Sequence, residues 1–255
     1  MKCIILGCGG SLGTPEIGCQ CHTCTSTNPK NKRLRPSIYI ESNDCKLLID
    51  ASTDLRQQAL THRITSLDAL IITHAHADHI SGLDDVKPLA KRSGKIVPTY
   101  LTETTWGSVR GTYGYLFENG ESTLYKPVLN KQIIPEKHNF EVNGLGIQTF
   151  PQVHGEMISL GIRIGNFAYS TDVSELSEKN IELLQNLDVW IVDCMRYHWA
   201  PTHSSYETTL DWIARLQPKQ AILTHMAHEI EYEQISKMLP ANVVAGYDGM
   251  VISLK

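Results

Sequence analysis

The segment His74-Ala75-His76-Ala77-Asp78-His79 gathers three imidazoles and one carboxylate within six residues. It follows the apolar residues 69–73, so it lies just past a strand that we expect to be buried. Imidazole and carboxylate are good ligands for borderline and harder divalent ions. In an extended segment the first two histidines project to the same side and can bind one ion. The following turn can direct the aspartate and the last histidine toward a second position. The sequence therefore predicts a metal site, with a solvated His-rich loop as the alternative.

A second cluster consists of cysteines. Three of the seven cysteines, Cys19, Cys21 and Cys24, lie within six residues. An odd number of cysteines fits a disulfide framework poorly, and clustered cysteines in a reducing compartment indicate metal binding. Three thiolates are one ligand short of a structural zinc site. His22 is nearby, but its reach is constrained because its neighbours are already candidate ligands. Three reduced cysteines without a metal are the alternative.

The composition limits the class of protein. The chain has 255 residues, 42% of them hydrophobic, and a formal net charge of −4. These values are typical of a folded globular protein rather than a disordered one. The acidic balance disfavours long nucleic acid as a partner. No stretch approaches the ~18 consecutive apolar residues of a membrane-spanning helix. Because the first seven residues read as a strand rather than a signal peptide, we expect a cytoplasmic protein.

Short apolar runs alternate with helical stretches along the whole chain, which indicates an α/β or α+β layered domain. With no repeat or linker to divide it, we expect a single domain over residues 1–255. A capping box at Ser204-x-x-Glu207 is expected to open a helix over 206–216. Strands are expected at 3–6, 37–41, 46–50, 69–73, 96–101, 146–150, 159–164, 167–170, 189–193, 220–224, 243–245 and 250–254. Further helices are expected at 53–62, 83–92, 103–109, 178–186 and 232–239.

The motif at 74–79 resembles the HxHxDH motif of the metallo-β-lactamase superfamily. The resemblance implies an αββα sandwich, in which two mixed β-sheets are flanked by helices. That family adds three later ligands, each at the end of a strand, and this chain has His154, Asp172 and His225 in matching order. Taken singly, Asp172 is also typical of a turn and His225 of a hydrogen-bonded interior histidine. As a set, they imply two metal positions: one held by His74, His76, His154 and Asp172, the other by Asp78, His79, His225 and the shared Asp172.

Two further features narrow the resemblance. The Cys19-x-Cys21-x-x-Cys24 pattern, together with Thr224-His225-Met226-Ala227-His228, is similar to the PhnP-type phosphodiesterases of the carbon–phosphorus lyase pathway. In that family the three cysteines and the second histidine hold a structural zinc. The resemblance thus implies a zinc-binding N-terminal loop at about 7–36, with His228 as the fourth ligand. It also implies that Asp50, at the end of an earlier strand, supports the catalytic metals without binding them.

The resemblance implies a dinuclear-metal-dependent hydrolase, a phosphodiesterase that cleaves a small cyclic or nucleotide-like phosphate ester. His203 matches a family histidine near the metals that acts as general acid or phosphate contact. We therefore take it, together with Asp78, as a catalytic candidate. A surface-loop histidine is the alternative for His203. Arg33, Arg35 and Arg196 could contact substrate phosphate, although lone arginines are usually solvated.

Other functions stay open at this point. PqqB-like relatives share the cysteine pattern and are linked to oxidative chemistry, and a non-catalytic ligand-binding member of the fold is a third reading. The expected cofactors are two divalent ions at the active site and one structural zinc. Manganese or zinc is favoured for the active site, with iron and nickel as further candidates. The expected partner is the small substrate, not a membrane, and a homodimer is one option for the assembly.

Overall fold

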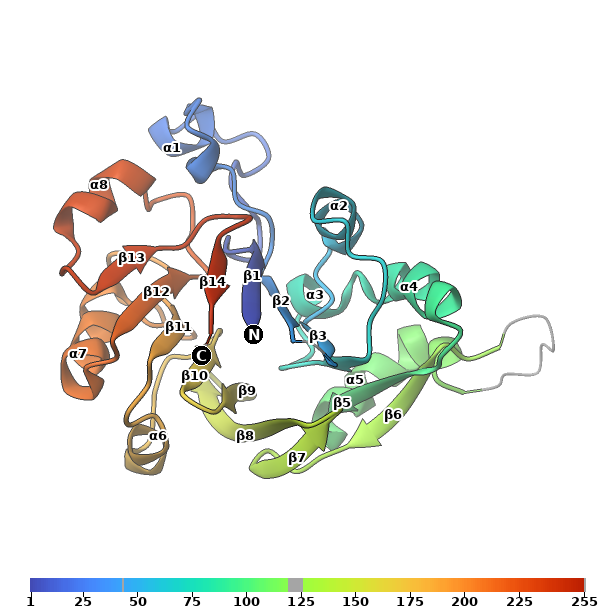
Figure 1. Ribbon diagram of the computed structural model, residues 1–255. Coiled ribbons are helices and arrows are strands. Elements are labelled where there is room, and N and C mark those ends of the chain that lie inside the picture. The colour runs from blue at the N-terminus through green and yellow to red at the C-terminus, as the bar shows by residue number, and fades with distance from the viewer. Residues whose placement is uncertain (43, 119–125, 255) are drawn as a thin grey trace.

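Two mixed β-sheets pack face to face in the computed structural model, which describes residues 1–42, 44–118 and 126–254 (Figure 1). The first sheet has the strand order β14-β1-β2-β3-β4-β5-β6 and the second β13-β12-β11-β10-β9-β8-β7. The strands of the first sheet are β1 (Lys2–Gly7), β2 (Ser37–Glu41), β3 (Lys46–Ile49), β4 (Ala69–Ile71), β5 (Val97–Leu101), β6 (Leu129–Ile133) and β14 (Val251–Ser253). Those of the second are β7 (His138–Val142), β8 (Leu145–His154), β9 (Met157–Ile164), β10 (Phe167–Ser170), β11 (Val189–Asp193), β12 (Gln220–Thr224) and β13 (Val243–Ala245).

Each sheet combines an antiparallel and a parallel part. In the first sheet the pairs from β14 to β3 are antiparallel, and those from β3 to β6 are parallel. In the second sheet β7 to β10 pair antiparallel, and β10 to β13 pair parallel. Parallel neighbours end at the same edge of a sheet. Residues that follow β3 and β4, or β10, β11 and β12, are therefore brought together.

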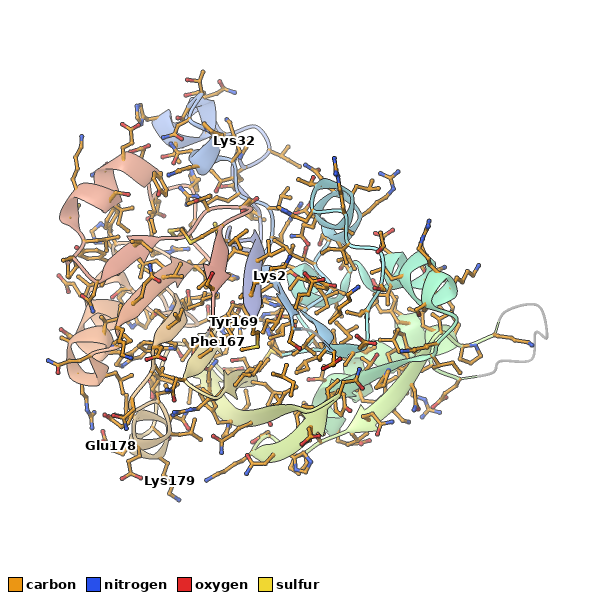
Figure 2. The ribbon with its side chains drawn as sticks, in the orientation of Figure 1. Lys2, Lys32, Phe167, Tyr169, Glu178 and Lys179 are labelled. Carbon is orange, nitrogen blue, oxygen red and sulfur yellow. The ribbon has the colours of Figure 1, made fainter. Side chains whose placement is uncertain are left out.

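The first sheet is buried on both faces. Ile38 and Ile40 of β2 belong to the core between the sheets, whereas Tyr39 belongs to a second core under the outer helices. This alternation with a period of two is what a strand produces when both of its faces are covered. Phe167 and Tyr169 of β10, labelled in Figure 2, contribute to the inter-sheet core from the opposite side.

Helices cover the outer face of each sheet (Figure 1). The helices are α1 (His22–Thr25), α2 (Leu55–Thr61), α3 (Ala77–Ile80), α4 (Val86–Ser93), α5 (Glu103–Tyr113), α6 (Glu178–Leu183), α7 (Tyr206–Leu216) and α8 (Tyr232–Met238). Helices α2, α4 and α5 add side chains to the core of the first sheet, and α6, α7 and α8 to that of the second. The expected αββα sandwich is confirmed. No helix among the described residues is long and apolar enough to cross a membrane.

The structure departs from the sequence expectations where local signals are weak. Strands β6 and β7 were not expected, because both are edge strands with partly exposed, polar residues. Helices α1 and α3 have four residues each, too few to show a helical period. The expected capping box is wrong by one residue. The hydroxyl of Ser205 accepts from Thr208 N–H, while Ser204 donates to the Asp193 carbonyl.

A close contact between β8 and β9 gives a test of the packing. Phe150 lies opposite Gly161, and a Cβ at Gly161 would lie 2.3 Å from the Phe150 ring. We expect Gly161→Ala to lower the free energy of unfolding by about 1–3 kcal/mol through overpacking. The control is Gly146→Ala in β8, where an added Cβ meets nothing within 4 Å. Denaturant unfolding of both variants measures the difference, and equal stability would contradict the packing described.

Candidate metal centre and its cavity

Three strand ends turn sharply toward a common centre. Asp50 follows β3, Asp172 follows β10 after one residue, and His225 follows β12. Their φ angles are +63°, +52° and +57°, a left-handed conformation that residues other than glycine rarely adopt. Such backbone costs of order 1–3 kcal/mol and concentrates at functional sites. The repeated strain indicates that these three side chains are held for a purpose other than stability.

The first group of candidate ligands converges on a small volume. One ligand atom from each of His74, His76, His154 and Asp172 lies within 4.8 Å of the others. His76 Nδ1 is 3.0 Å from His74 Nε2 and 3.1 Å from His154 Nε2. These separations are a little shorter than the about 3.4 Å expected for two nitrogens on one tetrahedral zinc. The arrangement suits a cation bound between the three rings.

Hydrogen bonds behind the rings determine which nitrogen faces the centre. The Thr73 hydroxyl donates to the Asp50 carboxylate, so its oxygen accepts from His74 Nδ1–H at 3.0 Å. The Nδ1–H of His154 likewise donates to the Thr202 carbonyl. Both Nε2 atoms therefore present a lone pair to the centre. A proton on His76 could satisfy only one of them, whereas a metal ion would satisfy all three nitrogens.

The second group is buried more deeply. It contains Asp78, His79, His225 and Asp172, again within 4.8 Å of one another. Asp78 Oδ2 lies 3.3 Å from His79 Nε2 and 3.4 Å from His225 Nε2. Behind the centre, His79 Nδ1–H donates to Asp50 at 2.7 Å. His79 Nε2 has no hydrogen-bond partner although carboxylate oxygens surround it, and a metal ion that replaced its proton would bind at this nitrogen.

Asp172 lies between the two groups. Its Oδ1 is 3.7 Å from Nε2 of His74 and of His154, and its Oδ2 is 3.1 Å from His79 Nε2. The carboxylate can therefore contact an ion in each group. A bridging carboxylate lowers the repulsion between two cations placed ~3.5–4 Å apart. The side chains present thus fit two metal ions.

The electrostatics of the site point the same way. Burial disfavours a charged His79, yet the neighbouring carboxylates, Asp172 first, raise the pKa of this imidazole well above its usual value. Burial also opposes ionisation of Asp172, but the imidazoles of His225 and His79 keep its pKa well below the usual range. Burial lowers the pKa of His74, which favours the neutral ring that a metal requires. The centre is therefore rich in anionic carboxylates and attracts cations.

A cavity of about 360 Å³ opens onto this centre. The candidate ligands His76, Asp78, His154, Asp172 and His225 line it. Residues 195, 196 and 200–203 and Ser11 of the N-terminal loop form the rest of its wall. A molecule in this cavity would contact both candidate metal groups and His203.

His203 is held in place by Asp193, a residue that the sequence reasoning missed. His203 Nδ1–H donates to Asp193 Oδ2 at 2.8 Å, and its Nε2 lies 3.9 Å from Asp172. The ring stacks on His225 with centroids 4.5 Å apart. Asp193 is the last residue of β11, so it occupies the same kind of strand-end position as the candidate ligands. This place at the end of a strand was the sequence signal that could have identified Asp193.

The three clustered cysteines meet His228 in a separate site. Sγ atoms of Cys19 and Cys21 lie 3.4 and 3.3 Å from His228 Nδ1, and Cys24 completes a group of four within 4.8 Å. All seven cysteines are free thiols. His228 Nε2 lies 3.2 Å from a Glu16 carboxylate oxygen, which can fix the orientation of the ring. His22 is not part of the group.

The thiols differ in how readily they ionise. Hydrogen bonds from His228 and from the Cys24 backbone N–H lower the pKa of Cys21 to about 6. Burial raises the pKa of Cys24 to about 11, so this thiol is expected to lose its proton only when a metal binds. Three thiolates and one imidazole would fill a tetrahedral zinc shell and leave no position for catalysis.

Comparisons with known proteins agree with this architecture. Residues 46–226 match the family described as "Beta-lactamase superfamily domain". A crystal structure of "a New Diphosphatase from the PhnP Family" has a TM-score of 0.92 and 34% sequence identity, and the match covers 98% of this chain and 96% of that one. Zn²⁺-bound PqqB from Methylobacterium extorquens shares the fold, with a TM-score of 0.82 at 20% identity over 100% of both chains.

Two curated proteins are also similar. An octanoyltransferase from Porphyromonas gingivalis is 33% identical over 253 residues, which are 98% of this chain but 51% of that protein. This chain thus spans about half the length of that relative. The exodeoxyribonuclease WalJ from Streptococcus pneumoniae is 24% identical over 83% of this chain and 85% of its own length.

The shared position of Asp172 can be tested by removing its charge. We expect Asp172→Asn to lower metal binding at both groups, because one carboxylate contacts each; Asn also tolerates the left-handed backbone of this residue. Metal content after equilibration with Mn²⁺ or Zn²⁺, measured by mass spectrometry, is expected to fall by more than one ion per chain. The control is Asp211→Ala, an exposed acid on α7. Full metal content in Asp172→Asn would exclude the bridging position.

The cysteine site predicts the loss of one zinc ion, independent of the dinuclear centre. Cys21→Ser is expected to release one zinc per chain and to lower the Tm by roughly 10 °C, since a structural zinc contributes folding free energy directly. The ions of the dinuclear centre should stay. Cys45→Ser is the matched control, because Cys45 is buried outside every candidate metal group of the described residues. Wild-type protein without thiolate-bound zinc in X-ray absorption spectra would refute this assignment.

Proposed function

We propose that this chain, which belongs to the metallo-β-lactamase superfamily and lies close to its PhnP-type diphosphatases, is a dinuclear-metal-dependent hydrolase of small phosphate esters. The observation that carries the proposal is the pair of ligand groups joined by Asp172 beneath one cavity. We assign His74, His76 and His154 to one ion and Asp78, His79 and His225 to the other. Such a pair of ions supplies hydroxide near neutral pH and polarises a phosphoryl oxygen.

His203 and Asp193 act on the leaving group in this proposal. His203 lines the cavity and faces the centre with Nε2, while its Nδ1–H is held by the buried Asp193. Asp193 thus fixes the ring orientation so that Nε2 faces the centre, where it can pass a proton to the departing oxygen. Asp78 has a different role, because it would bind a metal ion at the wall of the cavity, beside His225.

The cavity size favours a small substrate. A volume of about 360 Å³ lies near the lower end of typical ligand sites, which run from roughly 300 to 1,000 Å³. It suits a cyclic or nucleotide-like phosphate ester better than a long nucleic acid, and the net charge of −4 agrees. The similar proteins named as a diphosphatase and an exodeoxyribonuclease support phosphate chemistry. The oxidative alternative is favoured by the fold shared with PqqB and by the similar cysteine pattern, neither of which concerns the substrate.

A substrate panel tests the proposal. Protein loaded with Mn²⁺ or Zn²⁺ would be assayed on bis-p-nitrophenyl phosphate, cyclic nucleotides, a ribose cyclic phosphate and short RNA. We expect hydrolysis of small esters that disappears on chelation and returns with added metal. Iron retained on purification together with oxygen-dependent turnover would instead favour the oxidative reading. No hydrolysis by fully metal-loaded protein would overturn the proposal.

The role of His203 predicts a dependence on the leaving group. A general acid contributes typically ~10²–10⁴-fold, and the benefit is largest when the leaving group is poor. We therefore expect His203→Ala to keep its metal content, to slow hydrolysis of an alkyl or ribose ester by about 10²-fold or more, and to affect a p-nitrophenyl ester less. Asp193→Asn should show the same pattern more weakly. His198→Ala, an exposed histidine of the same segment, serves as control.

The comparison of the two esters decides the role. Equal losses on both would mean that His203 binds phosphate or positions water and does not donate the proton. Unchanged rates on both would make it a structural residue that merely lines the cavity.

A further inference from the structure

The three arginines near the site differ in what their side chains contact. Arg33 is fully buried, and its guanidinium donates to the backbone carbonyls of Met226, Ala227 and Ile230. Arg35 pairs with Asp54 at 2.8 Å. Both guanidinium groups therefore form contacts within the protein. Arg196 has no ion pair among the described residues.

Arg196 lies in the wall of the active-site cavity. Its backbone is fixed beside the segment that carries His203, because it forms a β-bridge with Ser205 and its carbonyl accepts from Tyr206 N–H. The carbonyl of the preceding Met195 accepts from Ala227 N–H in the segment that carries His225. The guanidinium makes one weak contact, 3.7 Å from Nη2 to the sulfur of Met195. Its Nε is buried and has no hydrogen-bond acceptor. A buried donor left unpaired costs about 1–3 kcal/mol, which an acceptor from a ligand would recover.

We propose that Arg196 binds a second anionic group of the substrate, next to the phosphoryl group held at the metal centre. Among the described residues that line the cavity, Arg196 alone carries a permanent positive charge. Guanidinium matches the paired oxygens of phosphate, and it does so best where water is excluded. The cavity therefore favours a substrate with two neighbouring phosphates over a diester with one negative charge. This inference rests on the proposed function for the location of the reacting phosphate.

Two nucleotides that differ by one phosphate provide the test. AMP and ADP would be measured as ligands of the metal-loaded protein, by calorimetry and as competitive inhibitors of bis-p-nitrophenyl phosphate hydrolysis, at a fixed free-metal concentration. We expect wild type to bind ADP at least about 10-fold more tightly than AMP, as one charge-assisted hydrogen bond allows. Arg196→Gln should remove this preference while AMP binding and metal content stay close to wild type. Arg196→Lys should restore part of it.

A matched control separates a local effect from a general change in charge. Arg215→Gln removes a cation that pairs with Glu178 on the exposed side of α7, and it should keep the full ADP preference. An equal affinity of wild type for the two nucleotides, or an ADP preference that survives in Arg196→Gln, would overturn the inference. If the protein prefers ADP in an Arg196-dependent way but hydrolyses no phosphate ester, Arg196 still binds an anionic group. That outcome would refute only the proposed function.

Discussion

Three carboxylates buried around a single imidazole are the constraint on which this site depends. Asp50, Asp78 and Asp172 are 0%, 6% and 1% exposed, and all three approach His79. Moving a carboxylate out of water costs several kcal/mol even after the protein relaxes. The imidazoles of His79 and His225, whose pKa values the neighbouring carboxylates raise, can offset part of this negative charge as protonated rings. Metal ions that replaced those protons would stabilise the folded site as well as serve its chemistry.

The two sheets contribute jointly to the centre. The first sheet supplies Asp50 and the 74–79 segment, and the second supplies His154, Asp172, Asp193 and His225. Each ligand group takes side chains from both sheets, so the packing between the sheets sets the distances within each group. The rigid inter-sheet core, with Phe150 packed on Gly161, therefore matters for the chemistry although it lies outside the cavity. The left-handed strand ends then direct the side chains inward.

Much of this architecture could be predicted from the sequence, and the failures have physical causes. Central strands such as 189–193 could be predicted because burial on both faces makes four of their five residues a continuous apolar run. Edge strands β6 and β7 gave no such signal. Ligands close in sequence could be grouped by spacing alone. The meeting of Cys19 with His228, 209 residues apart, came only from a family resemblance. Asp193 and Arg196 were overlooked or left undecided because their roles depend on partners that no local pattern reveals.

The N-terminal loop helps to position the segment that carries His225 and His228. His225 and His228 are three residues apart, so a shift of one displaces the other. The backbone between them is hydrogen-bonded to the N-terminal loop. Met226 N–H donates to the Cys8 carbonyl, and Gly10 N–H donates to the Met226 carbonyl. Gly9 permits this approach, since an added Cβ would lie 2.8 Å from the Arg33 carbonyl. Arg33 then closes the contact through three carbonyls of the 226–230 segment. The N-terminal loop that carries the cysteine cluster thus constrains the candidate ligand His225 through backbone contacts.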